Sequence, residues 1–595
     1  IYDYYHILDD YGYYDGEERE FRGFGMVEQW DAETYGALEA DGLLPGADNL
    51  SADTHLPPVL TKTWFHTGLY QDGERISNHY AFTDGADAYW HEPGQRYDET
   101  RASLLLDTIL PEGLTIGEER EAVRALKGSM LRQEVYALDD SERATTPYTV
   151  TEQNYTVRCL QHRGDNRHAV FFTHPSESIS RHYERNPSDP RTSHGLTLKV
   201  DDYGNVLRSL TIGYGRRPGQ SELDAEARQA QEQTLITYTE NDVTNAIDDP
   251  ALYPNDYRTP LPAETRSYEL TGFQSDAGEE LFAYHQWPLT LLDDLDEIPY
   301  EQAPNGTLPQ KRLVERTRTR FRADDLSTIL PVGVVEPHAL LGDNHTLAFT
   351  PGLLDGAYVR DGTSLLPVDR SEFLEDTGPN GSGYVDLDDD GHWWLPSGKV
   401  FLSPDVDDST ADELAYAQAH FFHPHRFRDP FGATSVVRYD GYDLLLLETE
   451  DALGNRTTCG ERDVMGNITA MGNDYRFLRP TLMSDPNRNR TQVACDALGL
   501  VVGTAVMGKP EESLGDSLVD FEPDLAQATV QSVMIDPLSN SQDLLGQATT
   551  RLVYDLFAYQ RTRHEPSPQP SVALTLTRET NVSDLSPGQQ TRIGH

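Results

Sequence analysis

Apolar and polar residues alternate over short stretches along most of the chain, which is the spacing of strands with one buried face. Residues 196–200 (LTLKV) and 206–212 (VLRSLTI) alternate in this way. Gly204 and Asn205 lie between them and are typical of a tight turn, so the two stretches are predicted to form a hairpin. Further strand-like stretches cover residues 149–151, 155–157 and 169–172. Helical spacing is confined to residues 118–131, 221–233 and 412–419. The pattern predicts a fold dominated by β-strands, with a few short helices.

From about residue 429 a turn motif becomes periodic. Asp-x-x-Gly, or a close variant, begins at Asp429, Asp451, Asp463, Asp485 and Asp496, at intervals of 22, 12, 22 and 11 residues. These intervals are multiples of a unit near 11, and an isolated copy begins at Asp201. In such a turn the aspartate binds its own backbone and the glycine adopts a positive φ. Repeats of this period predict a stacked or spiralled array of β-hairpins.

The charge balance narrows the classes of partner. The chain carries 99 acidic and 48 basic residues, a formal net charge of −51. Such a surface repels phosphate backbones, so we expect no binding to nucleic acid. Two explanations for the acidity remain open: an acidic cavity or tail that holds a basic partner, and adaptation to high salt. We favour salt adaptation, because the acids are spread along the whole chain and only six of the basic residues are lysines.

The cysteines and the apolar stretches argue against a disulfide-rich protein, a Cys-x-x-Cys metal site and a membrane-spanning segment. Cys159, Cys459 and Cys495 are too few and too far apart to indicate a disulfide framework or a Cys-x-x-Cys metal site. No stretch approaches the roughly 18 consecutive apolar residues that cross a bilayer. The chain opens on strand-like residues without a methionine, so we expect it to be a piece of a longer polypeptide.

One acidic segment is a candidate calcium site. Asp386, Asp388 and Asp390 match the opening of a calcium-binding loop, D-x-D-x-D-G. A full loop has glutamate at its twelfth position, where this chain has Ser397. We therefore favour a solvated turn of aspartates and expect no cofactor, with calcium as the alternative.

Histidines are candidates for other metals, but their spacing argues against a site. His162, His168, His174, His182 and His194 fit no standard zinc pattern. A second group, formed by His423, His425 and Asp429, contains a proline and is surrounded by phenylalanines, which favours a structural corner over a metal or base site.

Motifs that indicate catalysis are absent from the sequence. It contains no G-x-S-x-G elbow, P-loop or H-E-x-x-H motif, so we expect no enzymatic activity. Arginines in the most distinctive segments are expected to pair with neighbouring acids. They are Arg22, Arg185, Arg191, Arg216 and Arg217.

The sequence resembles a known family along nearly its whole length. Residues 439–447 (YDGYDLLLL) resemble the RHS (YD) repeat. Longer segments resemble the TcdB-like B component of Tc-type insecticidal toxin complexes, in the same order. They are residues 13–30, 147–155, 183–191, 201–217, 237–247, 261–272, 347–354, 391–404, 421–432 and 493–509.

The resemblance implies an all-β-dominated fold in which RHS/YD-repeat hairpins spiral into a hollow shell. The implied partners are a C component that carries a variable toxic domain and a pore-forming A component. It also implies secretion, no direct membrane span, and a shell that encapsulates the toxic effector. The family's self-cleaving aspartate site lies in the C component and has no matching segment here. Four segments are expected: residues 1–125 (first shell strands), 126–275 (the TcdB-like middle/C-terminal domain), 276–425 (further shell strands) and 426–595 (the RHS/YD-repeat region).

The alternative function is a YD-repeat surface adhesion or carbohydrate-binding protein. A transmembrane segment in the full-length chain would favour adhesion, whereas an adjacent gene with RHS repeats and a variable tail would favour the toxin complex. An ADP-ribosylating or proteolytic enzyme would need a catalytic domain outside these residues.

Overall fold

A computed structural model describes most of the chain. It covers residues 3–6, 12–16, 18–31, 58–70, 76–77, 89–94, 104–139, 141–219, 223–276, 280–375, 382–538, 540–565 and 568–594. Within these residues one sheet of 25 strands dominates, and the helices are short. The expected all-β-dominated fold is confirmed.

The main sheet is an antiparallel meander, in which each strand pairs with the next one added along the chain. Its strands, in spatial order, are β1 (Asp3–His6), β4 (Met26–Asp31), β5 (Val59–Phe65), β6 (Met130–Ala137), β7 (Thr149–Gln161), β8 (Val170–His182), β9 (Arg191–Val200), β10 (Val206–Gly213), β11 (Leu235–Val243), β12 (Pro262–Thr271), β14 (Gln310–Arg322), β15 (Leu340–Phe349), β19 (Trp393–Phe401), β20 (Arg426–Arg428), β21 (Thr434–Tyr439), β22 (Leu446–Glu450), β23 (Arg456–Thr458), β28 (Leu482–Ser484), β29 (Arg490–Cys495), β30 (Val501–Met507), β31 (Thr550–Asp555), β32 (Val572–Arg578) and β33 (Ile593–Gly594). The predicted hairpin around Gly204 is the β9–β10 pair.

Other short strands either pair with a strand of this meander or form separate two-stranded ribbons. β13 (Asp296–Ile298) runs parallel to the start of β14, and β18 (Val385–Asp386) pairs with β19. Separate two-stranded ribbons are β2 (Gly12–Asp15) with β3 (Glu20–Phe24), β16 (Val359–Arg360) with β17 (Thr363–Ser364), β24 (Gly460–Arg462) with β25 (Ile468–Met471), and β26 (Asn473–Asp474) with β27 (Arg479–Pro480).

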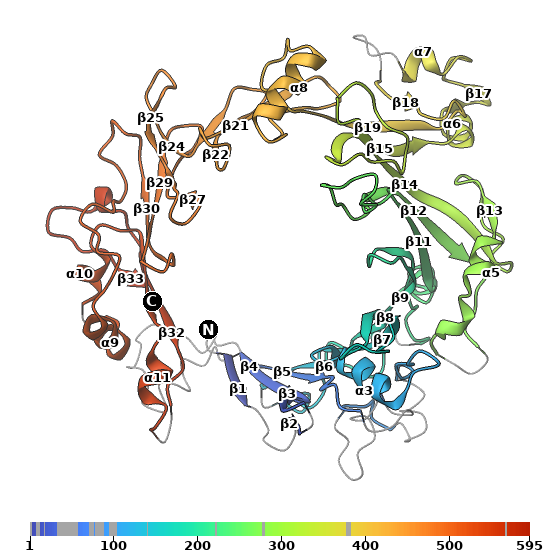
Figure 1. Ribbon diagram of the computed structural model, residues 1–595, viewed down its shortest axis with the longest axis horizontal. Coiled ribbons are helices and arrows are strands. Elements are labelled where there is room, and N and C mark those ends of the chain that lie inside the picture. Colours follow the sequence, from blue (N-terminus) through green and yellow to red (C-terminus); the bar gives the residue numbers. More distant parts are fainter. Residues whose placement is uncertain are drawn as a thin grey trace.

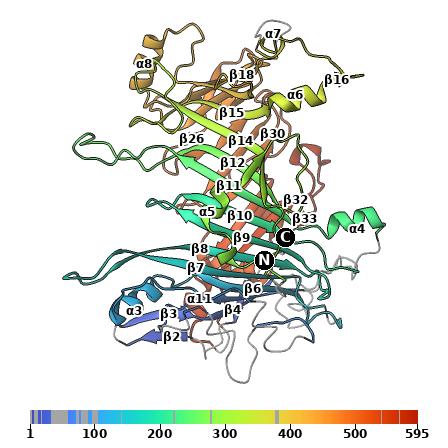
Figure 2. The same ribbon diagram turned by 90° about the vertical axis from the view of Figure 1, so that its right-hand side faces the viewer.

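The strands follow one another around an open centre, so that the two termini come close together (Figure 1). Seen from the side, the strands cross the ring at a slant and are layered one above another (Figure 2). The helices labelled in Figure 1 lie outside the ring of strands, and α4 projects past one edge of the strands in Figure 2. The described helices are α3 (Ile116–Arg124), α4 (Ala225–Gln231), α5 (Leu289–Asp293), α6 (Pro351–Ala357), α7 (Ser371–Leu374), α8 (Thr410–Ala419), α9 (Gln527–Ile535), α10 (Ser541–Leu545) and α11 (Ala558–Thr562). Among the described residues, no pairing joins β33 to β1.

The hydrophobic cores are separate clusters that lie along the sheet. In one of them, Ala122, Val123 and Leu126 at the end of α3 pack with Trp64 of β5 and Val157 of β7. In a sheet that curves around an open centre, strands on opposite sides never touch. Each stretch of the sheet therefore buries its apolar face under its own helix or loop.

The helices differ in length from those expected. The predicted helix over 118–131 begins at Ile116 and ends at Arg124, and Met130 already belongs to β6. A capping box between Thr115 and Glu118 fixes its start. Gly128, with φ +84°, turns the chain back toward the sheet, which helical spacing alone does not reveal. Of the segment 221–233, residues 221–222 lie outside the described residues, and the helix covers Ala225–Gln231. The third helix, over 412–419, is confirmed as α8.

The Asp-x-x-Gly turns have the expected chemistry. The carboxylate of Asp451, for example, accepts hydrogen bonds from the backbone N–H groups of Leu453 and Asn455, both at 2.9 Å, and Gly454 has φ +81°. Asp429, Asp463 and Asp496 accept the same pair of backbone bonds. A hydrogen bond from the Asn455 side chain, together with these backbone bonds, holds the pKa of Asp451 below its usual value.

Two further turns complete the period. Asp440 accepts from the N–H groups of Tyr442 and Leu444, and Asp474 accepts from that of Arg476. With these two copies, successive turns from Asp429 to Asp496 are eleven or twelve residues apart. The sequence pattern missed them because neither has glycine at the left-handed residue. This residue is Asp443 (φ +54°) in the first turn and Leu478 (φ +54°), one position later, in the second.

A matched pair of glycines tests this turn geometry. Replacing Gly454 by alanine is expected to cost about 1–2 kcal/mol, because an L-residue is strained in the left-handed region. Gly441→Ala, in the preceding turn, should cost less than about 0.5 kcal/mol, since its φ lies outside that region and a Cβ would meet nothing within 4 Å at either glycine. Thermal melting of the two variants measures the difference. Equal melting temperatures would contradict the assignment of strain to Gly454.

Candidate functional site: the two faces of the curved sheet

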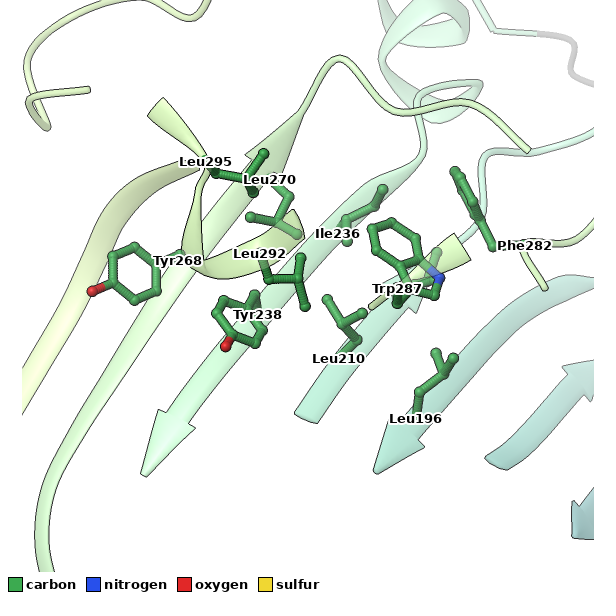
Figure 3. Close-up of a cluster of buried hydrophobic side chains, with 11 residues drawn as sticks. Leu196, Leu210, Ile236, Tyr238, Tyr268, Leu270, Phe282, Trp287, Leu292 and Leu295 are labelled. Atoms are coloured by element: carbon green, nitrogen blue, oxygen red, sulfur yellow. The ribbon is translucent and has the colours of Figure 1, made fainter. Parts of the chain in front are cut away.

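The outward face of the sheet is apolar over β9 to β12. The register places Leu196, Leu210, Tyr238 and Tyr268 side by side on successive strands, and all four are buried. Figure 3 shows Phe282, Trp287, Leu292 and Leu295 packed on them from the segment around α5. Because α5 lies outside the ring of strands (Figure 1), this face points away from the open centre.

Next to this apolar row, the same outward face carries a row of charges. Arg208, Glu240, Arg266 and Arg316 are register partners on β10, β11, β12 and β14. Arg266 binds Glu240 at 3.0 Å, and Glu264, 8% exposed, accepts from Arg316 at 2.8 Å and from Arg318 at 2.5 Å. Burial would raise the pKa of Glu264, but these arginines hold it below its usual value. Pairs that cross from strand to strand in this way fix the register of the sheet.

The charged network extends along the sheet in both directions. Arg132 of β6 binds Glu134 at 2.7 Å and Glu152 of β7 at 2.6 Å, and all three side chains are buried. Farther along β14, Arg320 binds Asp343 of β15 at 2.8 Å, and Arg322 binds Glu413 of α8 at 3.0 Å.

The inward face of the same strands is lined by small hydroxyl side chains. Thr197, Ser209, Thr239 and Ser267 are register partners on β9 to β12 and are half-buried. A neighbouring row consists of Asn241, Thr265, Thr317 and Thr346. Side chains alternate between the two faces of a strand, so these rows point toward the open centre. These two rows present neutral polar groups, and charges on the inward face lie at their edges, with Glu315 beside Ser267 and Glu269 beside Thr237.

The arginines singled out from the sequence pair with acids, as expected. Arg22 binds Asp15, Arg185 binds Asp139, Arg191 binds Glu184, Arg216 binds Asp189, and Arg217 binds both Glu92 and Glu280. Arg22 is buried and also donates to the backbone oxygen of Gly68 at 2.6 Å. Arg217 joins segments that are 125 and 63 residues away. These arginines therefore connect different parts of the outer layer.

The candidate calcium loop uses its carboxylates within the protein. Asp386 accepts from the backbone N–H of Gly391 at 2.9 Å, and Asp390 accepts from that of His392 at 3.0 Å. Asp388 binds Arg318 at 2.7 Å. The three carboxylates are thus directed to three different partners, an arrangement that fits a turn of aspartates better than a cation site. The expectation of no cofactor at this loop, with calcium as the alternative, remains a prediction.

The five histidines between His162 and His194 do not converge. His162 and His168 contact Glu118 and Glu121 of α3 at 3.1 and 2.8 Å, and His194 contacts Glu177 at 3.2 Å. Within the described residues, none of the five belongs to a group of three metal-type ligands.

A different histidine group does converge. His420 at the end of α8, His425 before β20 and Asp443 in the turn after β21 each place one ligand atom within 4.8 Å of the other two. Asp429, the carboxylate suggested by the sequence, instead closes its own turn. Burial lowers the pKa of His425, and the neighbouring His420 lowers it further. The sequence could have pointed to Asp443 through its place in the YDGYD segment. No feature of the sequence singled out His420.

Comparison with known proteins matches part of the chain to one family. Residues 121–253 match the family model of the insecticide toxin TcdB middle/C-terminal region. This part of the chain is TcdB-like. No match was found among the curated proteins. The match covers the strands from β6 to β11, where the apolar and charged rows begin.

Solved structures extend the likeness to the whole fold. In the crystal structure of TcdB2–TccC3, the similarity covers 98% of this chain and 25% of the solved chain, with 24% identity and a TM-score of 0.52. In the Tc holotoxin pore of Photorhabdus luminescens, it covers 99% and 27%, with 22% identity and a TM-score of 0.54. The chain therefore has the fold of one part of these proteins and spans about a quarter of their length. No helix among the described residues is long and apolar enough to cross a membrane.

Proposed function

We propose that this TcdB-like chain is a wall segment of a Tc toxin B component. In this proposal it joins a C component to enclose a toxic effector, which a pore-forming A component then delivers, and the assembly is secreted. The observation that carries the proposal is the separation of the two faces of the sheet. The helices labelled in Figure 1 lie outside the ring of strands, and the apolar cores and charged rows share that outward face. Rows of small neutral side chains lie on the opposite face of β9 to β12.

The inward rows suit a container for an unfolded chain. A large apolar patch would bind and collapse a guest polypeptide, and fixed charges would bind segments of opposite charge. Threonine and serine hydroxyls do neither. The wall itself needs only shape and stability, so we assign no catalytic role to it.

The four segments expected from the sequence are proposed as stretches of one wall. The meander passes through residues 125, 275 and 425 without a break in strand order, because β5 pairs with β6, β12 with β14, and β19 with β20. Residues 426–595 would supply the RHS/YD-repeat part, with its turns eleven or twelve residues apart.

A labelling experiment on the full-length protein, co-expressed with its C component, tests enclosure. Thr237 on the inward face of β11 and Thr290 on α5 are both exposed, and each is replaced by cysteine. The native cysteines Cys159, Cys459 and Cys495 are replaced by serine in both variants. A maleimide on a 5-kDa-class polymer is added to the assembled particle.

The expected result is labelling at position 290 and protection at position 237, with both positions labelled after denaturation. A small maleimide serves as the control for reactivity. Equal labelling of both positions by the polymer in the assembled particle would contradict enclosure. A chain that never forms a joint particle with its C component would contradict the proposed partnership.

A further inference from the structure

The group formed by His420, His425 and Asp443 lies where three segments meet on the outside of the ring. α8 ends at Ala419, β20 begins at Arg426, and β21 ends at Tyr439. Figure 1 places α8 beside β21 and β22, outside the strands. Nδ1 of His420 lies 3.0 Å from both carboxylate oxygens of Asp443, and the ring centroids of the two histidines are 5.9 Å apart. The three side chains thus face one another across a small space.

One member of the group has an unused ligand atom. His425 is only 3% exposed, and its Nε2 is buried without a hydrogen-bond partner among the described residues. A buried polar atom without a partner costs about 1–3 kcal/mol, so such atoms are rare in folded proteins. The rings of Tyr416 and Tyr439 hold the imidazole in place, with centroids 5.0 and 5.1 Å away, but they contact it through edges and faces.

We propose that His420, His425 and Asp443 bind a divalent transition metal ion of the Zn²⁺ class. Two imidazole nitrogens and one carboxylate oxygen are a ligand set of zinc sites that leave a fourth position open to water. Calcium and magnesium prefer oxygen ligands only, so the two nitrogens select against them. Neither the family comparison nor the proposed wall function accounts for this group.

The geometry needs a modest contraction to hold the ion. Ligand atoms around tetrahedral Zn²⁺ lie about 3.3 Å apart, given bonds of roughly 2.0–2.1 Å. The contact between His420 and Asp443 is already within that distance, so most of the movement falls on the remaining atom pairs. The ion takes the place of the proton between Nδ1 of His420 and the carboxylate, and in neutral His420 that proton moves to Nε2, so the imidazole stays neutral.

The bound ion would link α8, the last helix before the periodic turns, to the second of those turns, which Asp440 closes. Asp443 occupies the left-handed position that glycine holds in the neighbouring turns, with φ +54°. An aspartate there places a carboxylate where a glycine would offer no ligand. The bound ion would tie α8 to the turn after β21 and stabilise that junction by mass action.

Zinc binding to the full-length protein, without a histidine tag and freed of metal by chelator, tests the proposal. Titration with ZnCl2 followed by calorimetry, and metal analysis after dialysis, should show one equivalent that is absent from His420→Gln and Asp443→Asn. Asparagine tolerates a left-handed φ, so the second variant keeps the turn. Loss of one of three ligands should weaken binding by about 100-fold or more.

A histidine–aspartate pair elsewhere provides the matched control. His338 contacts Asp324 at 2.7 Å but has no second histidine in a group of three among the described residues. His338→Gln should keep the equivalent of zinc. The parent should also give the visible absorption of tetrahedral Co²⁺ when cobalt replaces zinc, and both ligand variants should lose it. Zinc binding that is equal in the parent and in both ligand variants, or no binding to the parent at micromolar zinc, would overturn the proposal.

Discussion

Replacing Arg132 by methionine is expected to destabilise the wall around β6 and β7 by about 3–5 kcal/mol, the cost of leaving buried charges without their partner. Arg132 is 3% exposed, and its guanidinium binds Glu134, Glu152 and the backbone oxygen of Trp90 at 2.6–2.7 Å. Burial alone would lower the pKa of this guanidinium, but Glu134 and Glu152 raise it well above its usual value. Methionine keeps most of the volume and removes only the charge and the donors.

Hydrogen exchange on the β6 and β7 amides of the full chain measures this effect. A loss of about 3 kcal/mol corresponds to more than a 100-fold increase in the exchange rate of amides that open with these strands. Arg191→Met is the matched control, because Arg191 and Glu184 form a pair whose side chains are 57% and 63% exposed. An exposed pair contributes about 0–1 kcal/mol, so this variant should exchange like the parent. Equal effects of the two substitutions would show that burial does not decide the contribution of these pairs.

The sequence predicts strands, turns and the pairing of arginines with acids, because these features depend on local spacing. Aspartate–glycine turns need only four or five consecutive residues, so their spacing is enough to identify those at Asp451 and Asp463. Alternation on either side of Gly204 likewise identifies β9 and β10 as a hairpin.

The arrangement of charges on a single face does not follow from the sequence. The segment Arg316-Thr317-Arg318-Thr319-Arg320 alternates between arginine and threonine, which assigns them to opposite faces but does not say which face is buried. That choice depends on Glu264 and Asp343, which lie more than 50 and more than 20 residues away from the arginines that they bind. Register between distant strands therefore decides which arginines are structural.

The histidine group is missed for a related reason. Closeness in sequence groups His423 and Asp429 with His425, but His423 instead packs against Tyr439, with ring centroids 4.7 Å apart. His420 and Asp443 come together only because α8 ends beside the turn after β21. The curved wall brings such pairs together on its outer side, where helices and turns meet.

Replacing Trp287 by alanine is the second substitution with a large expected effect. Trp287 is 2% exposed and lies at the centre of the cluster that covers the outward face of β9 to β12, with ring centroids 5.0 Å from Phe273 and 5.1 Å from Phe282 (Figure 3). Truncation of a buried tryptophan leaves a cavity and costs about 3–5 kcal/mol. Because the segment around α5 supplies Phe282, Trp287, Leu292 and Leu295 to this cluster, the loss should appear in that segment first.

Trp287→Phe separates packing from polar contact at the same position. The indole Nε1 is buried without a hydrogen-bond partner among the described residues, so phenylalanine keeps an aromatic ring and removes an unpaired N–H. Trp287→Phe should lower the free energy of unfolding by less than about 1.5 kcal/mol. Phe431→Ala, at a side chain that is 91% exposed, should change stability by less than about 0.5 kcal/mol.

Exchange of the β10 and β11 amides and thermal melting of the three variants give the comparison. The expected order of destabilisation is Trp287→Ala, then Trp287→Phe, then Phe431→Ala. If phenylalanine were as damaging as alanine, a polar contact of the indole and not its packing would hold the cover in place. If alanine at position 287 had no effect on β10 and β11, the cover would not stabilise the wall. In that case the apolar cores on the outward face would not be needed to keep the sheet curved. The inward hydroxyl rows would face the open centre without them.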